Sequence, residues 1–255
     1  MNFTRAAILP RFFCPLPLLA GLRMDIPENV ARHAVKSRRM KAGDALVLFN
    51  GLGGEFAGRI AAAGSDKSER LMVEVEEKHE IERESPLAIT LIQALLPGEK
   101  MDMAIQKAVE LGVRRIVPVI SRRSVPRLEG GRKQRRLEHW RGIVISACEQ
   151  CGRNRLLEID TPQDLASYLG SLDPAPDMGT RRILLPDADT RLLEHLPTLG
   201  RIDLLIGAEG GFDPEEIRLA RAKDFFPSRL GQRILRTETA GIAAVAAIQS
   251  LWGDF

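Results

Sequence analysis

The sequence predicts two domains, a small β-barrel over residues 1–85 and a larger α/β domain over residues 86–255. Before residue 80, short apolar runs are separated by turn residues, a pattern that is typical of small barrels. After residue 86, apolar strands alternate with amphipathic helices, as they do in α/β sheets. The charged run at residues 80–86 separates the two patterns and predicts the domain boundary.

In the first domain, strands are predicted at residues 45–49, 55–60 and 71–76. The last of them alternates apolar and charged residues, which indicates a half-buried strand. Asn50 and Gly51 form a hairpin signal between the first two. Upstream, Asn29 is expected to cap a short helix that carries His33.

In the second domain, strands are predicted at residues 87–96, 115–120, 156–159, 183–185 and 202–206. Helices are predicted at residues 100–111, 132–151, 161–169, from 214 onward, and 237–249. Gly112 is placed to end the first of these helices. Pro118 lacks an amide hydrogen, so we expect its strand to lie at a sheet edge or to bulge there.

Composition narrows the function. Net charge is only +3, but basic residues gather between positions 122 and 141 and predict contact with a polyanion; a solvated helix face is the alternative. No apolar run approaches the roughly 20 residues that span a bilayer, so no membrane partner is expected. An odd set of three cysteines suits a reducing cytoplasm. Four scattered histidines predict no metal site, and phosphate-loop and dinucleotide glycine motifs do not occur.

Two glycine-containing loops near the carboxyl terminus stand out. Residues 207–212 follow the strand at 202–206 and precede a helix that Asp213 and Glu216 can begin as a capping box. Such a turn lies at the carboxyl end of a strand, where open α/β sheets bind ligands. Residues 230–240 lead into a helix rich in alanine and glycine. Either loop alone could be a tight turn, but together with their charged residues they indicate a ligand site.

These loops resemble a known signature. The pattern Gly207-x-Glu209-Gly210-Gly211-Phe212, followed by Leu230-Gly231-x-Arg233-Ile234-Leu235-Arg236-Thr237-Glu238-Thr239-Ala240, is similar to that of the RsmE family. These are 16S ribosomal RNA uridine methyltransferases of the SPOUT superfamily. The resemblance implies a PUA-like barrel that binds RNA, a SPOUT domain with a C-terminal trefoil knot, and a homodimer that completes each site. The family pattern also has a lysine near Pro97, which this chain lacks.

The resemblance implies the site as well. S-adenosylmethionine would be bound by Leu185, Ile206, Gly207, Glu209, Gly210, Gly211, Leu230, Gly231, Ile234, Leu235, Thr239 and Ala240. Ribosomal RNA of the small subunit would be contacted by His33, Arg39, Arg123, Arg132, Arg136, Arg153 and Arg233. His33 could equally be a partly buried polar residue on its helix.

The catalytic candidates are Arg236 and Glu238. Methyl transfer to uracil nitrogen 3 needs close positioning and loss of a weakly acidic proton, which a cation near the ring oxygens favours. Arg236 is the first candidate for this cation and Arg233 the second. Glu238 could act as the base, or it could hold an arginine or the loop. Two other functions remain open: methylation of transfer RNA, and a non-catalytic role as an RNA-binding assembly factor.

Overall fold

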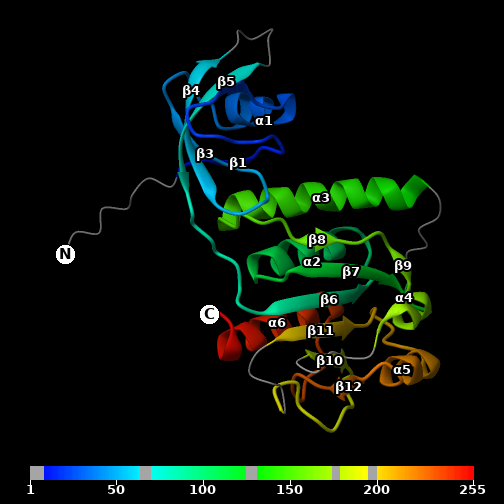
Figure 1. The fold of residues 1–255 in the computed structure, drawn as a ribbon. Helices are drawn as coiled ribbons and strands as arrows, with labels where there is room; N and C mark the ends of the chain where they lie inside the picture. The colour runs from blue at the N-terminus through cyan, green and yellow to red at the C-terminus, as the bar shows by residue number, and fades with distance from the viewer. Residues whose placement is uncertain (1–8, 64–69, 125–130, 174–178, 195–199) are drawn as a thin grey trace. The chain divides into compact units, whose positions relative to one another are not determined.

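A computed structural model of the chain describes residues 9–63, 70–124, 131–173, 179–194 and 200–255 (Figure 1). It divides into two compact units. The first consists of Met1–Glu84 and Cys148–Leu156, and the second of Ser85–Ala147 and Leu157–Phe255. A charged run can indicate where a chain leaves a domain. It does not indicate that the later segment Cys148–Leu156 also belongs to the first unit, because that packing depends on residues far away in the sequence.

The first unit is built on a five-stranded sheet with the order β1-β3-β4-β5-β2. Its strands are β1 (Arg11–Phe13), β2 (Arg23–Asp25), β3 (Ala45–Phe49), β4 (Glu55–Ala63) and β5 (Leu71–His79). β1 pairs with β3 in parallel, and the other neighbours are antiparallel. Leu71, Val73 and Val75 alternate inward on β5 and join the hydrophobic core. The small β-rich domain predicted from the sequence is confirmed.

A short helical segment covers part of this core. It comprises α1 (Glu28–Arg32) and the π-helical turn η1 (His33–Ser37). The N-cap is Pro27, whose carbonyl accepts the amides of Val30 and Ala31, so the expectation that Asn29 caps the helix is wrong. Proline fixes its φ at a value compatible with a helix start, and the helix begins there without a side-chain cap.

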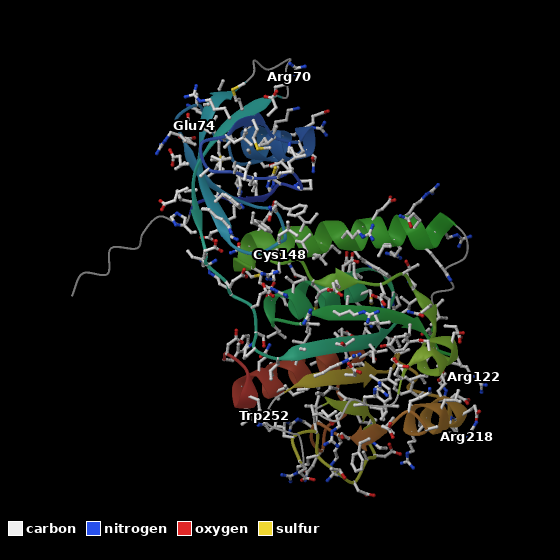
Figure 2. All side chains as sticks on the ribbon, in the orientation of Figure 1. Arg70, Glu74, Arg122, Cys148, Arg218 and Trp252 are labelled. Carbon is white, nitrogen blue, oxygen red and sulfur yellow. The ribbon has the colours of Figure 1, made fainter. Side chains whose placement is uncertain are left out.

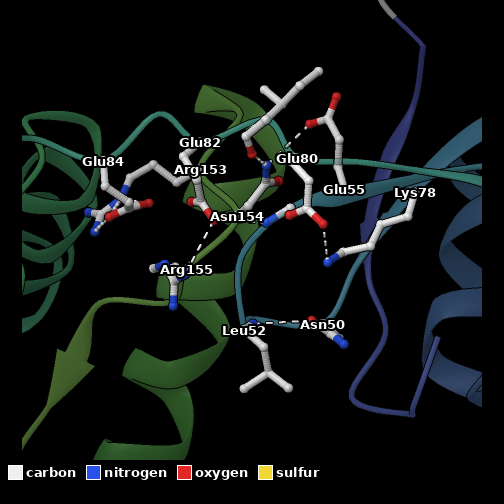
Figure 3. Close-up of polar contacts among 12 residues, drawn as sticks. Asn50, Leu52, Glu55, Lys78, Glu80, Glu82, Glu84, Arg153, Asn154 and Arg155 are labelled. Carbon is white, nitrogen blue, oxygen red and sulfur yellow. Dashed lines mark hydrogen bonds and ion pairs between the residues drawn. The ribbon is translucent and has the colours of Figure 1, made fainter. Parts of the chain in front are cut away.

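The segment Cys148–Leu156 is held in the first unit by polar contacts (Figure 3). Arg153 is only 4% exposed and pairs with Glu84 at 2.6 Å. The amide of Asn154 donates to the carbonyl of Ile81 at 2.6 Å. Arg155 forms a more exposed pair with Glu82 at 3.3 Å. These contacts join the segment Cys148–Leu156 to the residues that follow strand β5.

A second charge cluster involves Glu55, which is buried beside Arg11 and Arg83. Burial by itself would raise the pKa of Glu55, but hydrogen bonds from Arg83 and Arg11 outweigh it and lower the pKa. Asn154 donates weakly to the same carboxylate, at 3.4 Å. Burial of this carboxylate is therefore compensated by two guanidinium groups.

The second unit holds a seven-stranded sheet in the order β12-β10-β11-β6-β7-β8, with β9 also paired to β7. All its pairings are parallel. The strands are β6 (Ala88–Ala94), β7 (Arg115–Ile120), β8 (Glu158–Ile159), β9 (Gln163–Asp164), β10 (Gly179–Leu184), β11 (Arg201–Ile206) and β12 (Phe225–Ser228). The helices are α2 (Gly98–Glu110), α3 (Gly131–Cys151, of which Cys148–Cys151 belong to the first unit), α4 (Leu165–Ser171), α5 (Pro214–Arg221) and α6 (Thr237–Trp252).

The predicted α/β class of this unit is confirmed, and so are two helix ends. Gly112 follows α2 with a φ of +74°, a left-handed conformation that favours glycine. Asp213 and Glu216 form the capping box of α5. α6 packs against α2, β6 and β11. The trefoil knot stays a prediction. In the part of the chain that the structure describes, no helix has the length and apolarity to cross a membrane.

The expectation for Pro118 is wrong, because β7 is not an edge strand. β6 pairs along one side of it. On the other side, β8 pairs with Arg115 and Ile116, and β9 pairs with Val119 and Ile120. In these pairings Pro118 lies in the gap between the two short strands. An interrupted neighbour therefore accommodates the missing amide hydrogen.

We predict that Arg153→Ala lowers the free energy of unfolding by about 2–3 kcal/mol, because it leaves the partly buried Glu84 without its cation. Arg155→Ala is the matched control: it breaks an exposed pair and should cost less than about 1 kcal/mol. Urea denaturation of the two variants measures both values. Equal losses would contradict the distinction between the buried and the exposed pair.

Candidate active site

A cavity of about 320 Å³ lies at the carboxyl ends of β10, β11 and β12 in the second unit. β10 pairs with both β11 and β12, so the segments that follow the three strands meet at one edge of the sheet. The cavity is lined by Leu184, Leu185, Pro186, Ile206, Gly207, Ala208, Glu209, Gly210, Gly211, Phe212, Arg229, Leu230, Gly231, Arg233, Ile234, Leu235, Thr237 and Ala240. Its walls are mostly apolar side chains and loop backbone, as in cofactor sites.

The loop after β11 turns sharply. The amide of Gly211 donates to the carbonyl of Ala208 at 2.9 Å, and Gly211 has a φ of +69°. Only glycine adopts this left-handed conformation without strain. A Cβ at Gly207 would lie 3.0 Å from the ring of Phe212, which is buried. The turn therefore needs glycine once for its backbone path and once for close packing.

The loop that follows β7 makes hydrogen bonds and an ion pair next to this turn. The backbone amide of Arg122 donates to Glu216 at 2.7 Å, and its guanidinium pairs with Asp213 at 2.8 Å. Arg122 and Arg218 both lie at the end of the unit that holds α5 (Figure 2). Arg123 donates to the carbonyl of Gly210 at 2.8 Å. Arg123, predicted to bind RNA, thus also supports the cavity wall.

Charged groups gather at the cavity edge where Glu209 lies. Lys100, from the first turn of α2, pairs with Glu209, and its Nζ lies 3.8 Å from Oε1 of Glu238. The hydrogen bond from Lys100 lowers the pKa of Glu209, and the charge of Arg236 lowers it further. Arg236 itself is exposed, at the N-cap of α6.

Glu238 differs from Glu209 because it is buried. Its Oε2 is covered and has no hydrogen-bond partner among the described residues. Glu238 and Arg236, the predicted catalytic pair, do not line the cavity, and neither does Thr239, which is exposed on α6. The structure places Glu238 beside Lys100 at the cavity edge instead.

The other predicted cofactor-binding residues all line the cavity, as does Arg233. The predicted binding residues did not include Leu184, Pro186, Ala208, Phe212, Arg229 and Thr237 on its wall, and sequence reasoning also missed Lys100. The one available signal for Lys100 was its position. A lysine in the first turn of a helix opposes the helix dipole, so another interaction must favour it.

Apart from Arg123 and Arg233, the predicted RNA contacts fall into three groups. Arg132 and Arg136 lie in the first turns of α3, where no described carboxylate pairs with them. His33 and Arg39 lie in the first unit. There the ring of His33 meets Phe12 edge-on, and Arg39 has a left-handed φ of 56°. The guanidinium of Arg153 is buried against Glu84, and its contact with RNA stays a prediction.

Known protein families match this chain over both of its units. Residues 83–249 match the family model of an RNA methyltransferase domain, and residues 26–69 match that of an RNA methyltransferase PUA domain. Ribosomal RNA small subunit methyltransferase E of Buchnera aphidicola subsp. Schizaphis graminum is 34% identical over 96% of this chain and 98% of its own length.

The chain belongs to the ribosomal RNA small subunit methyltransferase E family.

Two solved structures resemble this chain over nearly its full length. The enzyme from Neisseria gonorrhoeae, bound to S-adenosyl methionine, superposes with a TM-score of 0.87 at 38% identity, covering 97% of this chain and 99% of its own. A methyltransferase from Legionella pneumophila, in complex with the same cofactor, gives a TM-score of 0.90 at 35% identity with the same coverage. The methyltransferase domain match contains every residue that lines the cavity, and the PUA match contains His33 and Arg39.

Proposed function

We propose that this protein transfers the methyl group of S-adenosylmethionine to nitrogen 3 of a uridine in 16S ribosomal RNA of the small subunit. The observation that carries the proposal is the cavity at three adjacent strand ends, with charged groups at its edge, in a chain of the methyltransferase E family. Two solved structures that this chain resembles contain this cofactor.

The cavity fits the cofactor chemically. Its volume of about 320 Å³ lies in the range of small-molecule sites, about 300–1,000 Å³. Leu185, Leu230 and Leu235 offer apolar surface to an adenine ring, and the glycine loop offers backbone amides and carbonyls. Glu209 supplies a negative charge for a cationic ligand. When bound, S-adenosylmethionine supplies a methyl group already activated by its sulfonium.

The chain's own residues then have to place the acceptor and favour loss of its proton. Arg236 is exposed beside Glu209 and can approach a uracil ring oxygen, where its charge stabilises the deprotonated ring. The covered Oε2 of Glu238 argues against a role as base, and among the described residues the cation within 4 Å of this carboxylate is Lys100 rather than the predicted arginine.

RNA is held by the basic residues of α3 and by the first unit, where His33 and Arg39 lie in the PUA-type segment. The protein acts in the cytoplasm as a homodimer, in which the second copy completes each site. Ile234, on a loop that lines the cavity, is 82% exposed, and a second copy would cover this apolar surface.

The test is methylation by the purified chain of small ribosomal subunits, protein-free 16S ribosomal RNA and transfer RNA, followed by mass spectrometry of the nucleosides. N3-methyluridine in the ribosomal samples is the expected product. Methylation of transfer RNA alone would replace the proposal with the transfer RNA alternative. No product, together with no binding of S-adenosylmethionine by calorimetry, would indicate a non-catalytic RNA-binding protein.

Arg236→Ala should lower kcat by about a hundredfold, because it removes a cation that acts on the developing ring charge. The Kd for S-adenosylmethionine should change by less than about threefold, since the donor is held elsewhere. Arg218→Ala, which breaks an exposed pair with Glu215 on α5, is the control and should keep the wild-type kcat. Equal losses in turnover and donor affinity would contradict this role for Arg236.

Replacing Arg132, Lys133, Arg135 and Arg136 together by glutamine should weaken RNA binding. The slope of log affinity against log salt should flatten by up to about three units, because each phosphate contact contributes about 0.7–0.9. Replacing Arg218 and Arg221 on α5 by glutamine removes two charges elsewhere and serves as the control. An unchanged slope in the α3 variant would remove this surface from the interface.

A further inference from the structure

Lys100 occupies a position that helix stability does not explain. It lies in the first turn of α2, after the N-cap Pro97, which makes no side-chain hydrogen bond. The N-terminus of a helix carries partial positive charge and favours anions there. The helix dipole therefore disfavours a lysine at this position, and its other contacts have to offset that cost.

Those contacts are two carboxylates from different segments of the site. Lys100 binds Glu209, on the loop after β11, and approaches Glu238, at the start of α6. The side chain of Glu238 is 11% exposed, whereas that of Glu209 is 52% exposed and that of Lys100 is 34% exposed. One partner is thus fixed and covered, and the other faces solvent and can be exchanged.

The surroundings of Glu238 leave it little else to bind. Gln93, Gly241 and Leu91 line a small space beside it. Gln93 directs its amide hydrogens to the carbonyl of Ala94, and its Oε1 has no hydrogen-bond donor among the described residues. Glu238 lies in the first turn of α6, where the helix dipole favours an anion, and a nearby cation compensates its charge further. Of the described cations, Lys100 is the one within 4 Å of Glu238.

From this arrangement we infer that Lys100 is a catalytic residue, whose ammonium is positioned by Glu238 and exchanges Glu209 for a carbonyl oxygen of the acceptor uracil. The inference rests on the proposed function and deepens it. Uracil nitrogen 3 lies between two carbonyl groups, and both share the negative charge when its proton leaves. The ring therefore has room for two cations, the held Lys100 and the exposed Arg236.

In this step the nitrogen 3 proton passes to water, and the nitrogen electron pair forms the bond to the methyl carbon. The electron pair of the broken carbon–sulfur bond stays on sulfur, which becomes a neutral thioether. Lys100 contributes by stabilising the ring anion before and during bond formation. A cation fixed in advance by a buried partner needs no reorganisation at that moment.

The experiment compares Lys100→Met, Lys100→Arg and the wild type on small-subunit RNA made with uridine or with 5-fluorouridine. Lys100→Met should lower kcat by roughly a hundredfold, with the Kd for S-adenosylmethionine within about threefold of wild type. Lys100→Arg should recover part of the loss. The defect of Lys100→Met should shrink on the fluorinated RNA, because fluorine makes nitrogen 3 more acidic and reduces the need for a cation.

Glu238→Gln tests the positioning. If Glu238 acts through Lys100, the double variant Lys100→Met, Glu238→Gln should be no slower than Lys100→Met alone. Thermal melting of each variant checks that the fold is kept.

A Lys100→Met variant with wild-type kcat, or with the same loss on both RNAs, would overturn the inference while leaving the proposed function intact. A wild-type protein that methylates neither RNA, whether free or assembled into small ribosomal subunits, would overturn the proposed function and this inference together.

Discussion

The site depends on one structural constraint, the parallel pairing of β10 with both β11 and β12. Parallel strands place their carboxyl ends at the same sheet edge. The pairing alone therefore brings the segments after these three strands together. Residues as distant as Leu185, Gly207 and Leu235 thereby line one cavity. The glycine residues set the path of the loops that line the cavity. The strand pairing brings those loops together at one place.

Local signals in the sequence predicted local structure well. The capping box of Asp213 and Glu216, the helix end at Gly112 and the strand β3 depend on residues close in the chain, and all three occur as predicted. The strands that went unrecognised, β1, β2, β9 and β12, are two to four residues long. Segments of that length show no periodicity, and distant partners decide whether they pair.

The same limit applies to charged residues. The glycine motif indicated the cavity because its residues are consecutive, whereas Lys100 and Glu209 are 109 positions apart. Arg153 and Arg132 read alike in the sequence, yet one is buried against Glu84 and the other is exposed. Counting basic residues predicts that a polyanion surface exists. Only packing shows which of its members are already bound within the protein.

Burial also explains how one lysine can serve two carboxylates with different consequences. Glu238 is largely covered, and among the described residues Lys100 is the cation near it, at 3.8 Å. Glu209 is exposed, so water can replace Lys100 there at small cost. In the proposed step the ammonium stays near the buried carboxylate and releases the exposed one, which leaves that side available for the uracil. An active site that must hold a cation and still present it to a substrate requires this asymmetry.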